Sequence, residues 1–174
     1  MANQLSALRQ QQNRMHLLAI SKKRWRNSMT SKPEQLLENQ LCFPIYAASR
    51  LVTRLYQPEL DKYKLTYPQY VILLILWQQD GVTVGEIGQQ AILNNNTLTP
   101  ILKRMADNNL IERRRDDWDE RKVRIYLTDY GNSLQQSLSC LPSQLVDKVG
   151  LDLDKAAQLK ALLGDLMLQL NEHS

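Results

Sequence analysis

The two cysteines are the most reactive side chains of this 174-residue chain. A thiolate is the nucleophilic form of cysteine and peroxides oxidise it, so Cys42 and Cys140 could do redox chemistry. A free cysteine is also often only a small apolar side chain, and two are too few to frame a disulfide-rich secreted domain. The histidines His16 and His173 lie near the ends without ligand spacing, so we expect no metal site, no cofactor and no hydrolytic centre.

Basic side chains surround a predicted hairpin. The bases are Arg113, Arg114, Arg115, Arg121, Lys122 and Arg124, and the acids at the tip are Asp116, Asp117, Asp119 and Glu120. Along a strand, Arg113 and Arg115 share one face and Arg114 takes the other. Asp119 stands two residues before Arg121 and can hold that arginine extended, which suits a side chain that probes a minor groove. A salt-bridged hairpin facing solvent is the alternative.

A predicted helix at 97–108 carries a third group of polar residues. Small polar side chains at a helix start can meet phosphates and base edges, and basic ones can neutralise phosphate. We expect Asn95 or Asn96 to cap this helix. The candidate DNA contacts are Asn95, Asn96, Thr97, Thr99, Pro100, Lys103 and Arg104. Ordinary capping and a solvated helix face would account for the same residues.

Caps and apolar periodicity place these candidates on a series of short elements. A Ser-x-x-Glu box at Ser31 predicts a first helix that runs to about Tyr56. Further caps are predicted at Thr66, Thr83, Thr128 and Asp152, and Pro142 should interrupt the chain between the last two helices. Strand-like runs occupy 111–115 and 123–127.

This order predicts a mainly α fold with a small β-hairpin, a winged helix-turn-helix. The DNA-binding part would cover about 66–128, and helices at about 31–56 and 142–172 would form a dimerisation region. An apolar stripe in the last helix suits that role, although it would be ordinary core in a monomer. Its members are Leu159, Leu162, Leu163, Leu166 and Leu170.

Charge is distributed unevenly along the chain. The formal net charge is +4, yet the first 35 residues hold seven basic side chains and one acidic one, and the rest hold 15 and 17. We therefore expect residues 1–30 to be a basic extension, disordered or not native, with Met29 as the start that matters and 31–174 as a single domain. An organelle presequence would have a similar composition. With no apolar run that could cross a bilayer, we expect a cytoplasmic protein with no membrane partner.

Four segments carry the pattern of a known family: 37–43 (LENQLCF), 65–70 (LTYPQY), 97–105 (TLTPILKRM) and 119–121 (DER). They resemble the MarR family of dimeric winged-helix regulators, and more narrowly its OhrR branch of organic hydroperoxide sensors. The resemblance runs from about residue 36 to the end. It implies that Cys42 is the peroxidatic thiol and that Tyr56 and Tyr67 hydrogen-bond to it. Cys140 lies where some members carry a resolving cysteine, although a core or surface cysteine is the alternative.

The predicted first helix sets conditions on this site. Cys42 would lie some nine residues inside it, too far for the helix dipole to help, so tyrosine hydroxyls would stabilise a thiolate. Pro44 should kink the helix beside the thiol. Tyr56 is fourteen residues further, about 21 Å along a helix, so the tyrosine that meets Cys42 would come from a partner subunit. The branch usually has Ser-Gly where this chain has Asn95-Asn96, so base preference should differ.

The sequence therefore predicts a homodimeric repressor rather than an enzyme. It would bind a pseudo-palindromic operator in double-stranded DNA and release it when an organic hydroperoxide oxidises Cys42. Two alternatives remain open. The same fold could be released by a small aromatic ligand, or the chain could be a thiol peroxidase, although Cys42 lacks a positively charged neighbour and the sequence has no CxxC.

Overall fold

The computed structural model describes residues 32–150 and 152–172. These residues divide into a unit that ends at Ser49 and a unit from Arg50 onward, and helix α2 (Cys42–Leu60) contributes to both. The predicted extension, Met29 and the predicted cap Ser31 lie outside the described residues. Among the described helices, none is long and apolar enough to cross a membrane.

The first helix begins later than the sequence predicts. Residues 32–40 form two 3₁₀ turns, Pro33–Gln35 and Leu37–Asn39, and α2 starts at Cys42. The side chains of Asn39 and Gln40 donate to the carbonyl oxygens of Pro33 and Glu34, which holds this segment in turns instead of a helix. Pro44 falls in the first turn of α2, where a missing N–H costs nothing, so the predicted kink was wrong.

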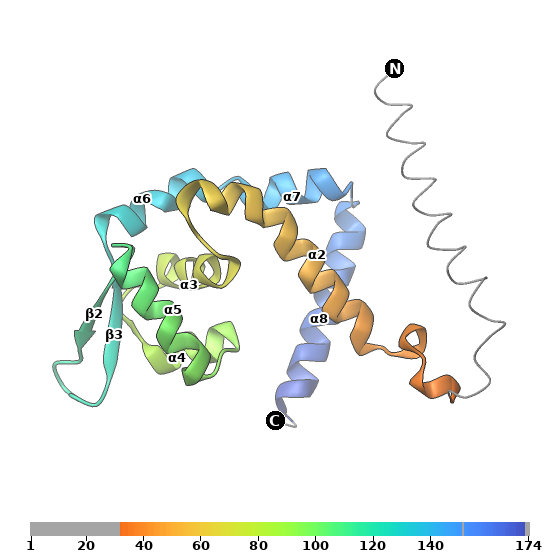
Figure 1. Ribbon diagram of the computed structural model, residues 1–174, viewed down its shortest axis with the longest axis horizontal. Coiled ribbons are helices and arrows are strands. Elements are labelled where there is room, and N and C mark those ends of the chain that lie inside the picture. Colours follow the sequence, from red (N-terminus) through yellow and green to blue (C-terminus); the bar gives the residue numbers. More distant parts are fainter. Residues whose placement is uncertain (1–31, 151, 173–174) are drawn as a thin grey trace, which may run out of the picture. The chain divides into compact units, whose positions relative to one another are not determined.

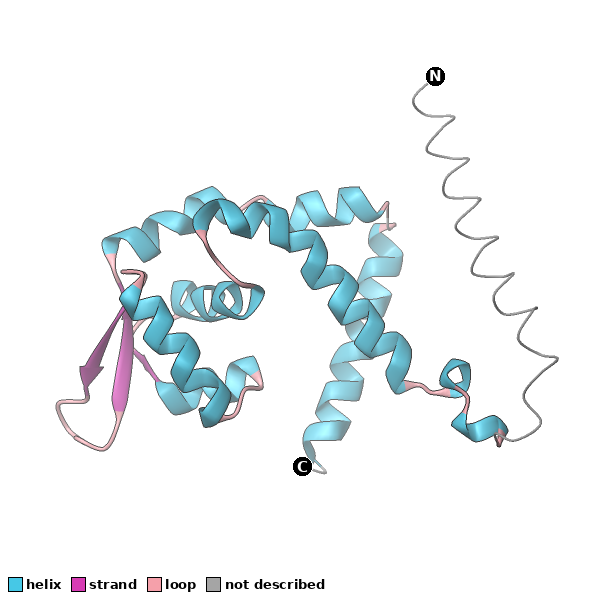
Figure 2. Cartoon of the chain, in the orientation of Figure 1, coloured by secondary structure: helices cyan, strands magenta, loops and turns pink. Residues whose placement is uncertain are grey.

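The second unit contains a winged helix-turn-helix, as predicted (Figures 1 and 2). Two antiparallel strands pair from Ile111↔Leu127 to Arg115↔Val123 and form the wing. These strands are β2 (Ile111–Arg115) and β3 (Val123–Leu127). A short strand that was not predicted from the sequence, β1 (Val82–Thr83), completes the sheet in the order β1-β3-β2. The elements after α2 are a 3₁₀ turn (Asp61–Tyr63), α3 (Tyr67–Gln78), β1 (Val82–Thr83), α4 (Val84–Ala91), α5 (Asn95–Asp107), β2 (Ile111–Arg115), β3 (Val123–Leu127), α6 (Asp129–Leu138), α7 (Leu141–Val149) and α8 (Leu153–Glu172).

Local capping residues begin three of these helices at the predicted positions. Thr66 and Thr83 form capping boxes with Gln69 and Glu86, and the Thr83 N–H donates to Glu86 Oε2 at 2.6 Å. The hydroxyl of Thr128 accepts the N–H of Gly131 at 3.0 Å. These bonds satisfy amides that have no partner inside the helix, which fixes where each helix starts.

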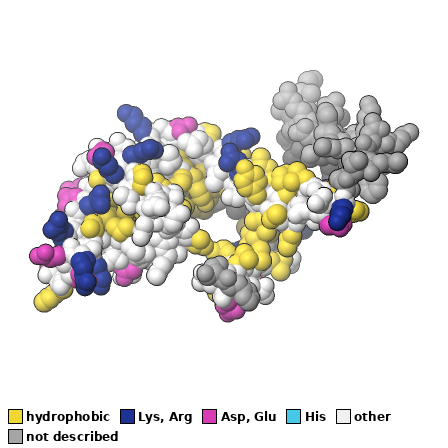
Figure 3. Space-filling view, turned by 60° about the horizontal axis from the view of Figure 1, so that its bottom comes forward, with side chains coloured by type: hydrophobic (Ala, Val, Ile, Leu, Met, Phe, Trp, Pro, Cys, Tyr) yellow, Lys and Arg dark blue, Asp and Glu magenta, His cyan; other side chains and the backbone are white. Residues whose placement is uncertain are grey.

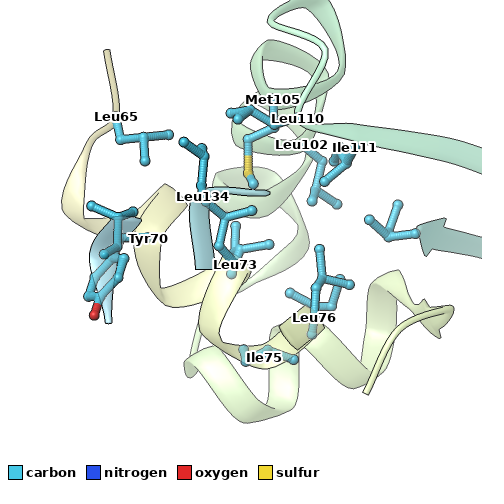
Figure 4. Close-up of a cluster of buried hydrophobic side chains, with 14 of the residues drawn as sticks. Leu65, Tyr70, Leu73, Ile75, Leu76, Leu102, Met105, Leu110, Ile111 and Leu134 are labelled. Atoms are coloured by element: carbon cyan, nitrogen blue, oxygen red, sulfur yellow. The ribbon is translucent and has the colours of Figure 1, made fainter. Parts of the chain in front are cut away.

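The core of the second unit lies between α3, α5, α6 and the sheet. α3 is buried over most of its surface, and side chains from α5 and α6 pack against it (Figure 4). Fully buried members include Leu73, Leu76, Leu102, Met105 and Ile125. Burial of each such side chain contributes roughly 1.5–3 kcal/mol to folding. This cluster therefore holds α3, α5, α6 and the sheet in one arrangement.

The chain after the wing forms three helices rather than the two predicted. Pro142 does interrupt it, because α6 ends at Leu138 and Pro142 occupies the first turn of α7. Asp152 then accepts the N–H of Asp154 at 2.8 Å and begins α8. No side chain described on α8 is buried.

Candidate DNA-binding and redox site

Cys42 is the first residue of α2, and its side chain is exposed. The expectation that the thiol lies deep inside a helix was therefore wrong. The first turn of a helix has free N–H groups and the positive end of the peptide dipoles, an environment that favours an anionic group. Tyr46 follows Cys42 by one helical turn.

The tyrosines implied by the family resemblance gather in the second unit. The ring centroids of Tyr56 and Tyr67 lie 5.2 Å apart in an edge-on arrangement. Tyr70, which the sequence analysis did not single out, completes the cluster at 5.8 Å from Tyr56 and 6.3 Å from Tyr67. Cys42 belongs to the first unit, whereas the three tyrosines belong to the second. The ring contacts that the structure shows are therefore those among the tyrosines themselves.

Burial changes the acidity of two of these tyrosines. Burial, followed by the neighbouring Tyr56 and Tyr67, raises the pKa of Tyr70 to about 12. Burial also raises the pKa of Tyr56, with a smaller contribution from Tyr67. Both hydroxyls therefore keep their protons at neutral pH and remain able to donate hydrogen bonds.

Cys140 is an exposed thiol at the junction of α6 and α7. The side-chain amide of Gln144 donates to its Sγ at 3.2 Å. The thiol is close enough to Tyr70 and Lys62 to contribute to the raised pKa of each. The structure therefore excludes the interpretation of Cys140 as a core side chain and places it on the surface near the tyrosine cluster.

Helices α4 and α5 form the helix-turn-helix. Ile92 adopts a left-handed conformation at the end of α4, and three residues later α5 begins. The cap of α5 is Asn94, whose Oδ1 accepts the N–H of Thr97 at 2.9 Å, so the predicted caps Asn95 and Asn96 instead stand in the first turn. The side chains of Asn95 and Asn96 therefore take no part in capping and are exposed.

Helix α5 separates an apolar face from a polar one. Leu98, Leu102 and Met105 are buried against the core. The predicted DNA-contacting residues all remain exposed, namely Asn95, Asn96, Thr97, Thr99, Pro100, Lys103 and Arg104. An exposed face that begins with small polar groups and continues with two bases can meet base edges and phosphates.

Asp116 fixes the base of the wing loop. Its buried carboxylate accepts the N–H groups of Trp118 and Asp119 at 2.9 and 3.0 Å, and it pairs with the Arg124 guanidinium. The Trp118 amide, followed by Arg124, lowers the pKa of Asp116. Arg124 also donates through Nη1 to the carbonyl oxygen of Gly81 at 2.8 Å, so the same pair links the wing to the turn before β1.

The wing arginines divide between two environments. Arg114 pairs with Glu112 at 2.6 Å and stacks on the Tyr126 ring, 4.8 Å from its centroid. Arg113 and Arg115 lie on the other face of β2, are exposed, and form no salt bridge within the described residues. The alternation predicted from the sequence is therefore present, and among the arginines of β2 only Arg113 and Arg115 form no salt bridge within the described residues. Figure 3 shows basic side chains spread over the end of the molecule that carries the wing, with acidic ones between them.

Arg121 and Asp119 pair at the tip in the way their spacing predicts. Asp119 Oδ1 accepts both the backbone N–H and Nε–H of Arg121 at 3.2 Å, and Oδ2 lies 3.7 Å from the Lys122 ammonium. The Arg121 side chain nevertheless remains 92% exposed. The pairing orients the guanidinium without covering it.

Comparison with known proteins places this geometry in a family. Residues 54–138 match the family model described as "Transcriptional regulator SarA/Rot". The organic hydroperoxide resistance transcriptional regulator of Bacillus subtilis is 43% identical over 136 residues, which cover 78% of this chain and 92% of that protein. The chain belongs to the MarR family of winged-helix transcriptional regulators.

Two further relatives of this MarR-family regulator support the same assignment. The HTH-type transcriptional regulator TtmR of Methylorubrum extorquens is 43% identical over 138 residues, 79% of this chain and 69% of that protein. The solved structure of reduced AbfR bound to DNA, a protein of Staphylococcus epidermidis, is 34% identical with a TM-score of 0.65 and covers 77% of this chain and 94% of that one. Both the fold and the family predicted from the sequence are therefore confirmed.

Several residues that organise the site of this MarR-family regulator were missed from sequence. Asp116 and Arg124 were noted only as charges, although the pairing of the buried carboxylate with the half-exposed guanidinium shapes the wing. Tyr70 stands at the edge of a long apolar run, which concealed its place in the tyrosine cluster. Asn94 precedes two further asparagines, and only the hydrogen bond to Thr97 distinguishes it as the cap.

Proposed function

We propose that this chain is a homodimeric repressor that releases DNA when an organic hydroperoxide oxidises Cys42. The observation that carries the proposal is the exposed Cys42 at the start of α2 in a chain so similar to the Bacillus subtilis organic hydroperoxide resistance regulator. A sensor thiol has to be reachable by its oxidant, and the exposed Sγ of Cys42 meets that condition.

The sensing step is a two-electron oxidation of sulfur. The Cys42 thiolate attacks one oxygen of the hydroperoxide, the O–O bond breaks, and a sulfenic acid forms on Sγ. The peroxide is reduced to the alkoxide, which takes a proton and leaves as an alcohol. One equivalent of peroxide is consumed for each thiol, so the protein acts as a switch and needs no turnover.

The tyrosine cluster would complete the sensor across a dimer. Tyr56 and Cys42 are fourteen residues apart on α2, a separation of about 21 Å in a continuous helix. We therefore assign the hydroxyls that meet Cys42 to the partner subunit. Support for a dimer comes from α8, whose exposed apolar side chains include Leu159, Leu162, Leu163, Met167 and Leu170. An apolar face of this size is costly in water unless another copy covers it.

Helix α5 and the wing would bind the DNA. The polar face of α5 would enter the major groove, and Arg121, aligned by Asp119, would reach the minor groove. Arg113 and Arg115 share one face of β2 and form no salt bridge within the described residues, so they would be available to neutralise phosphates. Two half-sites of a pseudo-palindromic operator would then lie about 34 Å apart, one helical turn of DNA.

Cys140 is the candidate resolving thiol. It is exposed and near Tyr70, so a sulfenic acid on the partner's Cys42 could condense with it to form an intersubunit disulfide and release water. Without that reaction, the sulfenic acid would be capped by a small thiol or oxidised further. The two outcomes differ on a non-reducing gel.

The test combines a mobility-shift assay with a non-reducing gel. Duplex DNA selected by the wild-type protein from a random-sequence pool is titrated before and after stoichiometric cumene hydroperoxide. We expect the wild type to release the duplex and Cys42→Ser to bind it and ignore the oxidant. Light scattering should give a dimer that Leu162→Glu dissociates, whereas the surface control Lys160→Glu leaves it intact. A crosslinked dimer lost in Cys140→Ser would identify the resolving thiol.

Other outcomes would replace the proposal. If no duplex is enriched, the chain is not a sequence-specific DNA-binding protein under these conditions. If Cys42→Ser responds like the wild type, a ligand or another group is the sensor, as in the small-ligand alternative. Repeated consumption of peroxide with a dithiol reductant would instead indicate a thiol peroxidase.

A further inference from the structure

Trp118 is a large apolar side chain exposed at the tip of the wing. It is 97% exposed, more than any other large apolar residue in the described part of the chain. Among the described residues, no aromatic ring or cation packs on its indole. An indole left in water contributes nothing to the core, so folding does not account for its presence at this position.

The backbone beneath Trp118 is nevertheless held in place. Its N–H donates to Asp116 Oδ1 at 2.9 Å, and the Asp116 carboxylate is itself buried and paired with Arg124. The Lys122 N–H donates to the carbonyl oxygen of Asp119 at 2.8 Å and closes the same loop. A fixed loop presents the indole outward at little entropic cost, as expected of a contact residue rather than a mobile tip.

Charges around the tip decide what the indole would meet. Asp119 is paired with Arg121 and Lys122, whereas Asp117 and Glu120 have no salt bridge within the described residues. Two free carboxylates beside the indole disfavour contact with a phosphate. Arg121, three residues away and 92% exposed, points to the minor groove in the proposed function. The surface between the two phosphate rows, made of sugars and base edges, suits an apolar ring.

We propose that Trp118 enters the minor groove beside Arg121 and packs its indole against deoxyribose and base edges. This proposal rests on the DNA-binding function proposed above and adds a nonionic contact to it. A bulky wedge widens the narrow groove and bends the duplex most easily at flexible pyrimidine–purine steps. Trp118 would therefore favour operators with such a step beneath each wing.

The experiment compares the wild type with Trp118→Ala and Trp118→Phe on a duplex that the wild type selects from a random-sequence pool. We expect about tenfold weaker binding for Trp118→Ala, with Trp118→Phe in between. Because the contact carries no charge, the slope of log affinity against log salt should be unchanged. The exposed aromatic Tyr130 on α6 gives the matched control, and Tyr130→Ala should bind like the wild type.

Fluorescence provides a second measurement. On DNA binding, the tryptophan emission of the wild type should shift to shorter wavelength and become less accessible to acrylamide, and this change should be lost in Trp118→Phe. Equal affinity of Trp118→Ala and the wild type, with no shift in emission, would overturn the proposal. If the wild type enriches no duplex, the proposed function fails instead.

Discussion

Arg124 on β3 donates to the carbonyl oxygen of Gly81 at 2.8 Å and also pairs with Asp116 at the base of the wing loop. One guanidinium thus joins the wing to the turn that follows α3. A second bond acts in parallel, because Asp80 accepts the N–H of Leu127 at 2.8 Å. The wing is therefore fastened at two neighbouring points to the turn between α3 and β1.

The first prediction concerns the charge of Asp116. Asp116→Asn should lower the free energy of unfolding, because it removes the charge that pairs with the half-exposed Arg124 and weakens the hydrogen bonds that hold the loop. The exposed neighbour gives the control, and Asp117→Asn should be nearly neutral. Chemical denaturation of both variants at neutral pH measures the difference.

The pH dependence of the same pair has a definite sign. The pKa of Asp116 is lowered by the Trp118 amide and by Arg124, so the folded state holds the charged form more tightly than the unfolded state does. Its contribution is fully present above the unfolded value near 3.9 and is lost as pH falls through the lower folded value. The gap between the wild type and Asp116→Asn should close in acid, and a constant gap would contradict the assignment.

A second prediction separates the arginines of β2. Arg113→Ala should weaken DNA binding and reduce the slope of log affinity against log salt by about 0.9, because one exposed phosphate contact is lost. Arg114→Ala should change the slope less, since Arg114 is already paired with Glu112 and stacked on Tyr126. Affinity titrations over a range of salt compare the two variants. Identical slopes for both would remove Arg113 from the interface.

A third prediction concerns the tyrosine hydroxyls. Tyr56→Phe and Tyr67→Phe keep the packed rings, which lie 5.2 Å apart, but remove the donors assigned to the partner's Cys42. Each should slow oxidation of Cys42 about tenfold and leave DNA affinity unchanged. Mass spectrometry of Cys42 after brief exposure to hydroperoxide gives the rate, with Tyr130→Phe as the control. Wild-type rates in both cluster variants would show that the hydroxyls take no part in the reaction.

A fourth prediction concerns alkaline stability. Burial raises the pKa of Tyr70 to about 12, while the unfolded tyrosine ionises near 10. Its contribution is therefore present below pH 10 and is lost as pH rises toward 12. The absorbance of tyrosinate should show a late-titrating group that disappears in Tyr70→Phe. Titration of all the tyrosines near 10 would contradict the burial argument.

Local signals made most of the fold predictable from sequence. Thr66, Thr83 and Thr128 each precede a helix and accept its first amides, so the cap can be read without knowing what packs nearby. The hairpin strands follow from alternation and were placed at the residues where they occur. Helix α5 begins two residues earlier than predicted, because three consecutive asparagines offer equivalent caps.

Longer-range relationships account for what could not be predicted. Strand β1 has two residues and exists only through pairing of Val82 with Ile125, far along the chain. The start of α2 depends on Asn39 and Gln40 returning to the backbone six residues earlier, which overrides an apparent capping box. Tyr70 joins the cluster through packing of α3 against Tyr56, which no spacing rule reveals.

The double attachment of the wing has a consequence for regulation. Arg124 and Asp80 secure the wing to the turn after α3, and α3, α5 and the sheet share one buried core. The wing and α5 should therefore move as one body when a signal arrives. A switch acting on the dimer would then alter the distance between two such bodies while each retains its base preference. Operators with altered spacing between half-sites, rather than altered half-sites, should therefore distinguish the reduced protein from the oxidised one.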